Sequence, residues 1–196
     1  MPTLRLLVAC LALSCPGSAS SAIRIHLYDY AGVSAPTLSE AKSFASDVLS
    51  RAGVNVIWSD CPTTDCARPA SPRVLQVRIL DRHMAKKVVA SKSCLGYALL
   101  SGEFSSFASV FFHKALELEK NSNAVRAQIL GAMLAHEIGH LLLGKDSHSR
   151  QGIMRGVWAE TDLRTIARGQ IRFSELEERR LTANAQARIR AVAGGQ

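Results

Sequence analysis

Residues 136 to 154 read HEIGHLLLGKDSHSRQGIM and have the types and spacing needed for metal chemistry. His136 and His140 are four positions apart, so on an α-helix their imidazoles lie on one face, about one turn apart. Glu137 projects alongside them. Two such imidazoles make half of a zinc site, and a neighbouring carboxylate is the base that zinc-assisted hydrolysis requires. The spacing therefore predicts a hydrolytic metal centre on a helix.

The segment after the helix contains the residues that can complete this centre. Gly144 is a typical helix end, and the GIM segment finishes at Met154. Together with the HEIGH residues, Gly144, His148 and Met154 resemble the metzincin clan of zinc peptidases, whose pattern is HExxHxxGxxH followed by a Met-containing turn. The resemblance implies a zinc endopeptidase that acts on protein or peptide substrates. In the implied site the Zn²⁺ ligands are His136, His140 and His148. Glu137 is the general base, and Met154 belongs to the Met-turn.

The spacing departs from the family pattern at the third ligand. The pattern would place glycine three residues and the ligand six residues after His140, where this chain has Leu143 and Asp146. Gly144 is instead four residues on and His148 eight residues on. A loop two residues longer accommodates His148, which we expect to be the third ligand. Asp146 is chemically competent to bind zinc and is the alternative.

Three other interpretations compete with this one. In a thermolysin-like hydrolase the third ligand would be Glu160, about 20 residues beyond His140, but Gly144 and the residues up to Met154 would then have no role. A non-catalytic zinc-binding secreted protein on a zincin scaffold would keep the ligands, yet binding alone needs no base at Glu137. A metal-independent structural domain would use the histidines only for packing.

The elements that must position these residues follow from periodicity. Alternating apolar residues predict strands at 23–30, 54–59 and 73–80, with two further candidates at 94–100 and 107–113. Helical spacing predicts helices over 38–51 and over 123–143, the second capped by Ser122 or Asn123 and apolar enough to be buried. A short helix after Ala159 and a last helix from Ser174, with a capping box to Glu177, complete the chain.

The resemblance turns this order into a fold expectation. It implies an α+β, metzincin-like zincin fold with a mixed, mostly parallel sheet, an antiparallel edge strand at 94–100, a backing helix and a central zinc-motif helix. We expect one metallopeptidase domain over 23–196, with an upper subdomain at 23–144. The lower subdomain, 145–196, would hold the third ligand, the Met-turn and the C-terminal helices.

Residues 1–22 have the composition of a secretory signal peptide. Arg5 precedes an apolar run over 6–13 and a string of small residues that ends at Ala22. The run is too short to span a bilayer, and no later segment reaches the roughly 20 apolar residues that a transmembrane helix needs. We therefore expect a secreted or periplasmic monomer without a transmembrane segment, and no room for a propeptide before the strand at 23–30.

The cysteines and the net charge indicate the compartment and the kind of partner. Removal of the signal would leave Cys61, Cys66 and Cys94, and a bridge between Cys61 and Cys66 suits an oxidising compartment. The formal net charge is +8. Many of the arginines after residue 163 alternate with glutamates, which indicates a solvated helix face, and no nucleic-acid-binding motif accompanies them. His26, His83 and His113 have no motif around them and are expected to be structural.

Overall fold

The computed structural model describes residues 22–67, 71–88, 94–100, 104–122 and 124–193. The predicted signal peptide at 1–22 therefore lies, apart from Ala22, outside the described residues. No helix within the described ranges has the length and apolar character needed to cross a membrane.

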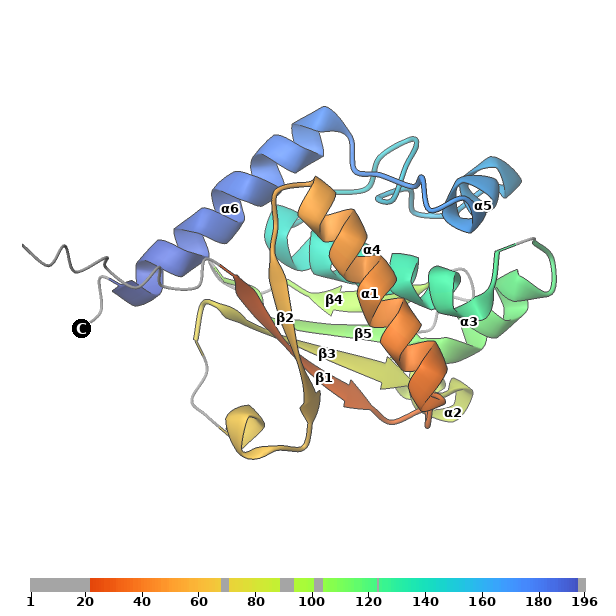
Figure 1. Cartoon of the computed structure of the whole chain (residues 1–196), viewed down its shortest axis with the longest axis horizontal. Helices are drawn as coiled ribbons and strands as arrows, with labels where there is room; N and C mark the ends of the chain where they lie inside the picture. The colour runs from red at the N-terminus through yellow and green to blue at the C-terminus, as the bar shows by residue number, and fades with distance from the viewer. Residues whose placement is uncertain (1–21, 68–70, 89–93, 101–103, 123, 194–196) are drawn as a thin grey trace, which may run out of the picture.

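A five-stranded sheet forms the base of the molecule (Figure 1), in the order β2-β1-β3-β5-β4. β1, β2, β3 and β5 are parallel, while β4 pairs antiparallel with β5 and forms the edge. The predicted α+β class, with a mostly parallel sheet and an antiparallel edge strand, is confirmed. The strands are β1 Ile23–Asp29, β2 Val56–Cys61, β3 Val74–Leu80, β4 Gly96–Leu99 and β5 Phe107–Phe111.

Alternation along β1 explains which side of the sheet carries the core. Ile23, Ile25 and Leu27 are buried in the main hydrophobic cluster. Successive side chains of a strand point to opposite faces, so His26 lies on the other side of the sheet. A short 3₁₀ turn at Thr64–Ala67 follows β2 directly.

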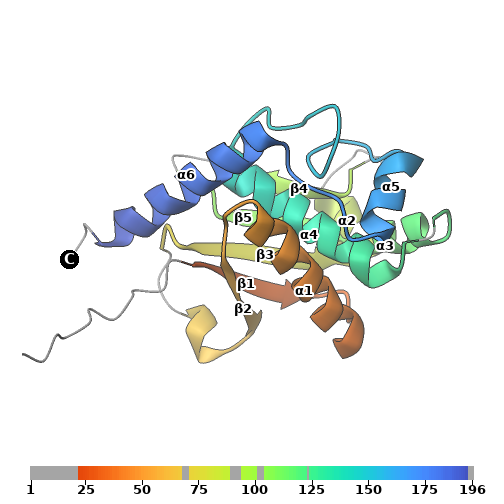
Figure 2. The same cartoon turned by 45° about the horizontal axis from the view of Figure 1, so that its top comes forward.

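Two long helices, α1 (Ala35–Arg51) and α4 (Arg126–Leu143), pack together over one face of the sheet (Figures 1 and 2). They approach closely at Gly131, where a Cβ atom would lie 2.6 Å from the Ala41 carbonyl oxygen. α4 is apolar on nearly every side and 15 of its residues are buried, as expected of a central helix. Its position sets the position of the HEIGH residues.

Shorter helices account for the differences from the sequence-based expectation. α2 (Arg82–Val88) and α3 (Phe112–Glu119) were not predicted, and α3 ends the strand expected at 107–113 two residues early. α4 begins at Arg126 rather than at residue 123, because Val125 is the N-cap and its N–H donates to the side-chain oxygen of Gln128 at 3.3 Å.

After α4 the chain is irregular until α5 (Glu160–Ala167) and α6 (Glu175–Ala193). The predicted capping box at the start of α6 is present. The Ser174 N–H donates to Glu177 at 2.6 Å, and the Glu177 N–H donates to the Ser174 hydroxyl at 3.4 Å. Both helices agree with the elements expected after Ala159.

Candidate metal centre

Three imidazoles from α4 and the loop that follows it converge on one point. The Nε2 atoms of His136 and His140 are 3.0 Å apart, and the Nε2 atom of His148 is 3.1 Å from that of His140. A tetrahedral ion with Zn–N bonds of about 2.0–2.1 Å would hold its ligand nitrogens roughly 3.3–3.4 Å apart. The observed spacing is therefore close to that of a preformed site for one metal ion.

Hydrogen bonds on the far side of two rings fix their orientation. Nδ1 of His136 donates to the Ile153 carbonyl oxygen at 2.7 Å, and Nδ1 of His140 lies 2.7 Å from the Ser147 hydroxyl. Because a carbonyl can only accept, Nδ1 of His136 carries the proton and its Nε2 lone pair points to the convergence point. Trp158 donates to the same Ile153 oxygen at 3.2 Å. Such outer contacts are typical of metal-ligating histidines.

Burial keeps the two helix histidines neutral. Desolvation, together with the neighbouring imidazoles, lowers the pKa of His136 to about 4 and the pKa of His140 to about 3. Both rings are therefore uncharged near neutral pH, and their Nε2 lone pairs are free to bind a cation. Three imidazole nitrogens form a donor set that suits zinc and neighbouring transition metals.

Glu137 is buried beside these rings, and its burial raises its pKa to about 8. Within the described part of the chain, its Oε2 atom has no hydrogen-bond partner. Strand β4 passes directly over the carboxylate at Gly96, where a Cβ atom would overlap Glu137 Oε1 and the Ser109 carbonyl oxygen. A buried carboxylate oxygen without a protein partner marks a position where a reacting molecule can supply the missing contact.

A cleft of about 270 Å³ lies in front of these groups. The edge strand β4 forms one wall, and the loop after α4 forms the other. The lining residues are Cys94, Leu95, Gly96, Tyr97, Ala98, Leu100, His136, Glu137, His140, Asp146, Ser147, His148 and Gly156.

The structure separates the three candidates for the third ligand. His148 joins the group of converging nitrogens, whereas Asp146 lines the cleft outside that group. The loop between α4 and His148 has positive φ values at Gly144 (85°) and at Asp146 (56°). Glu160 begins α5, forms an ion pair with Arg164 at 2.5 Å and is not brought to the cluster.

Glycines on both sides of the cluster allow close packing. A Cβ atom at Gly139 would lie 2.6 Å from the sulfur of Met154, so this buried methionine lies against α4 between the two histidine positions. A Cβ atom at Gly156 would lie 3.3 Å from Nδ1 of His148. The two glycines thus leave room for the Met154 side chain and for the third imidazole.

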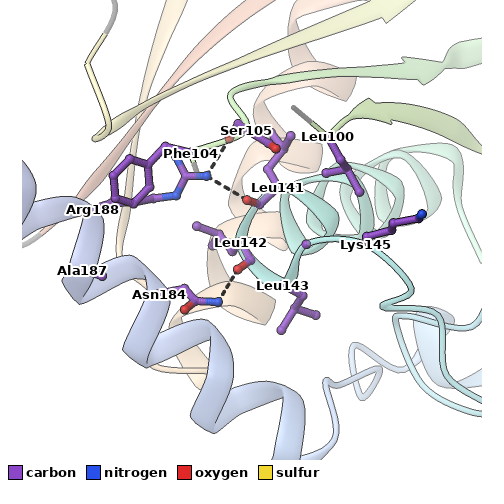
Figure 3. Close-up of a pocket in the computed structure, with 11 residues that line it drawn as sticks. Leu100, Phe104, Ser105, Leu141, Leu142, Leu143, Lys145, Asn184, Ala187 and Arg188 are labelled. Atoms are coloured by element: carbon purple, nitrogen blue, oxygen red, sulfur yellow. Dashed lines mark hydrogen bonds between the residues drawn. The ribbon is translucent and has the colours of Figure 1, made fainter. Parts of the chain in front are cut away.

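Helix α6 holds the C-terminal end of α4 (Figure 3). Its side chains at four-residue intervals donate to three consecutive carbonyl groups, residues 141 to 143, that lack partners within α4; Figure 3 shows the bonds from Arg188 and Asn184. Arg188 donates to the first at 2.8 Å, Asn184 to the second at 2.6 Å and Arg180 to the third at 2.9 Å. The helix end from which the chain turns toward His148 is therefore fixed by another element.

Sequence reasoning missed several of these supporting residues. Ser147, Gly96 and Trp158 belong to no motif in the sequence. Adjacency to His148 was the one available signal for Ser147, because the loop that carries a ligand often carries its outer-sphere partner as well. The roles of Gly96 and Trp158 depend on strand pairing and on a backbone carbonyl, which residue types do not reveal.

Known structures resemble this chain at the level of the fold. No protein-family model and no curated protein sequence matches it. A zinc-dependent peptidase from Methanocorpusculum labreanum aligns with a TM-score of 0.51 and 15% identity, over 80% of this chain and 99% of that one. An archaemetzincin from Methanopyrus kandleri aligns with a TM-score of 0.49 and 15% identity, over 85% and 97% of the two chains. At 15% identity the first alignment establishes a shared fold.

Proposed function

We propose that this protein is a zinc-dependent peptidase. The observation that carries the proposal is the convergence of three imidazole Nε2 atoms beside the buried, unpartnered Oε2 of Glu137. The fold shared with a zinc-dependent peptidase supports the same reading.

In this proposal His136, His140 and His148 hold the metal. When bound, Zn²⁺ supplies a Lewis acid that polarises a substrate carbonyl and lowers the pKa of water. Glu137 accepts the proton of the attacking water at its free carboxylate oxygen and returns it to the leaving amine. Ser147 and the Ile153 carbonyl keep the His140 and His136 rings turned toward the metal. Met154 provides an apolar floor.

Strand β4 is the part of the cleft suited to an extended peptide. It is one of the two outer strands of the sheet, and among the described residues it pairs only with β5. Its free edge can pair with the main chain of a substrate, which is a common mode of peptide recognition. Gly96 lets this strand run directly over Glu137, so a peptide paired with it would place a carbonyl beside the base.

We further propose that the enzyme acts outside the cytoplasm. The signal-like composition of residues 1–22 and the disulfide between Cys61 and Cys66 support this location. N-terminal sequencing of the protein recovered from the extracytoplasmic fraction tests it, with processing after Ala22 or Ala19 as the expected result. Unprocessed protein confined to the cytoplasm would contradict the proposal.

Substitution of the base tests the catalytic proposal. We expect Glu137→Gln to retain one zinc ion per chain but to slow hydrolysis of a denatured protein substrate by about 10²–10⁴-fold, the usual contribution of a general base. Zinc content is measured by elemental analysis and cleavage by fluorescence. Unchanged cleavage in Glu137→Gln would overturn the role of the base. If the wild-type chain bound zinc but hydrolysed no substrate, the result would favour the alternative of a non-catalytic zinc-binding protein.

A further inference from the structure

A second group of metal-ligating atoms lies on the other side of the sheet from α4. It consists of His26 on β1, Cys61 at the end of β2 and Cys66 in the 3₁₀ turn that follows. A ring nitrogen of His26 and the two Sγ atoms all lie within 4.8 Å of one another. In Figure 1 the turn after β2 projects away from α1 and α4, and this group is separate from the three imidazoles of α4 and the loop after it.

Strand register explains why these residues meet. Tyr28 is the register partner of Cys61 and His26 is the partner of Ser59, so His26 and Cys61 lie two residue rows apart on the same face of the sheet. The chain then turns back through Thr64–Ala67 and brings Cys66 over this face. His26 is only 3% exposed, whereas both cysteines are partly exposed. The group therefore has a fixed, buried imidazole and two sulfur atoms that solutes can reach.

In the structure Cys61 and Cys66 form a disulfide, and this state cannot bind a cation through thiolates. A two-electron reductant such as a water-soluble phosphine converts the disulfide to two thiols. The S–S bond breaks, one water oxygen converts the phosphine to its oxide, and each Sγ becomes a thiol. A divalent cation then displaces the two thiol protons to solvent.

We propose that in the reduced chain His26, Cys61 and Cys66 form a binding site for Zn²⁺ or a similar soft divalent cation. Two thiolates and an imidazole are among the preferred zinc ligands, and solvent can take the fourth position. In a tetrahedral site with Zn–S bonds of about 2.3 Å the sulfurs sit roughly 3.8 Å apart. Releasing the bond between Cys61 and Cys66 and opening the short turn is enough to reach that spacing.

In this proposal the turn after β2 is cross-linked in one of two ways, by a disulfide or by a bound metal ion. The disulfide closes it when the chain is oxidised, and the metal closes it when the chain is reduced. This inference is independent of the proposed peptidase function, because it concerns different residues and a different face of the sheet.

Metal titration of oxidised and phosphine-reduced full-length protein tests the proposal. We expect elemental analysis to find one zinc per chain in the oxidised protein and two in the reduced protein. With Co²⁺, only the reduced protein should show a thiolate-to-metal charge-transfer band, since the three-imidazole cluster contains no sulfur. A reduced wild-type chain with one metal ion and no such band would overturn the proposal.

Matched variants assign the ligands. Cys61→Ser/Cys66→Ser should lose the second metal and the thiolate band, whereas Cys94→Ser should keep both. His26→Gln should weaken the second site by more than about tenfold, the least expected even for loss of an outer-sphere partner. Retention of the first metal in each variant shows that the chain has folded. Loss of the band in Cys94→Ser, or unchanged affinity in His26→Gln, would contradict the assignment.

Discussion

His148 and Asp146 are two positions apart on one loop, but only the imidazole reaches the other two ring nitrogens. We therefore expect His148→Ala to weaken zinc binding by at least about 100-fold, beyond the effect of losing an outer-sphere partner. Asp146→Ala should change the zinc affinity by less than about threefold, because no ligand is removed. Competition with a chromogenic chelator measures both affinities. The reverse order of effects would make Asp146 the ligand.

Glu137 gives the metal-free protein a distinctive pH dependence. Its folded pKa of about 8 lies above the ordinary value of 4.5, so between these values the folded chain binds more protons than the unfolded chain. The free energy of unfolding must therefore fall as the pH rises through this range. His136 and His140 act oppositely and mainly at lower pH, since the unfolded histidines are half protonated at their ordinary pKa of 6.5.

Between pH 6.5 and 8 the contribution of Glu137 is the difference between the wild type and Glu137→Gln, which contain the same histidines. We expect chelator-treated wild-type protein to lose up to about 2 kcal/mol over this interval, because one pKa unit corresponds to about 1.4 kcal/mol. Glu137→Gln should lack this loss, since glutamine does not titrate. Urea unfolding at the two pH values measures the difference. Parallel pH profiles for the two proteins would show that Glu137 is not the responsible group.

At the residue scale, the sequence predicted the groups that have a motif. The HEIGH spacing on a long apolar helix predicted that His136, Glu137 and His140 lie together, because residues four apart on a helix share one face. It favoured His148 but kept Asp146 as the alternative, since the loop geometry depends on backbone angles, including positive φ values at Gly144 and Asp146, that spacing does not encode. The role of the Ile153 carbonyl as the acceptor for His136 could not be predicted, because every residue has a carbonyl group.

At the scale of elements, α6 is the support that the zinc-motif helix depends on. Arg188 is 2% exposed and donates to the carbonyl groups of Pro72, Ser105 and Leu141. Replacing it leaves these buried acceptors without a donor, at a typical cost of 1–3 kcal/mol. We therefore expect Arg188→Met to lower the free energy of unfolding by about 2 kcal/mol.

Arg190 on the same helix is the matched control, because it is exposed. Arg190→Met should stay within about 0.5 kcal/mol of the wild type. Urea denaturation of the two variants, compared at equal pH and salt, measures the difference. Equal stabilities for Arg188→Met and Arg190→Met would show that the buried hydrogen bonds do not anchor α4.

Long elements were predicted better than short ones. Two-residue alternation and helical spacing identified all five strands, α1, α4, α5 and α6 near their observed bounds. Of the three helices with only seven or eight residues, α5 was predicted but α2 and α3 were missed, because about two turns give only a weak periodic signal. The start of α4 was placed too early because Ser122 and Asn123 are better caps by residue type than Val125, the N-cap in the structure.

At the scale of the whole molecule, a metal at the cluster would join α4 to the loop after Gly144. A ligand that binds only the folded chain stabilises it by about 4 kcal/mol at a free concentration 1,000 times its Kd. We expect zinc to raise the melting temperature of chelator-treated protein by roughly 8–16 °C under those conditions. Differential scanning calorimetry measures the shift. His140→Ala should show little zinc-dependent change, and an equal shift in that variant would place the stabilising metal elsewhere.

The close approach at Gly131 also governs the order of folding. Residues 35–51 and 126–143 touch there although most of the sheet lies between them in the sequence. Contacts that close such long loops carry a large entropic cost and form slowly. The helix that carries His136 and His140 takes its final place only when this contact closes. We therefore expect the three-imidazole site to form late in folding, so that the metal binds a nearly complete scaffold.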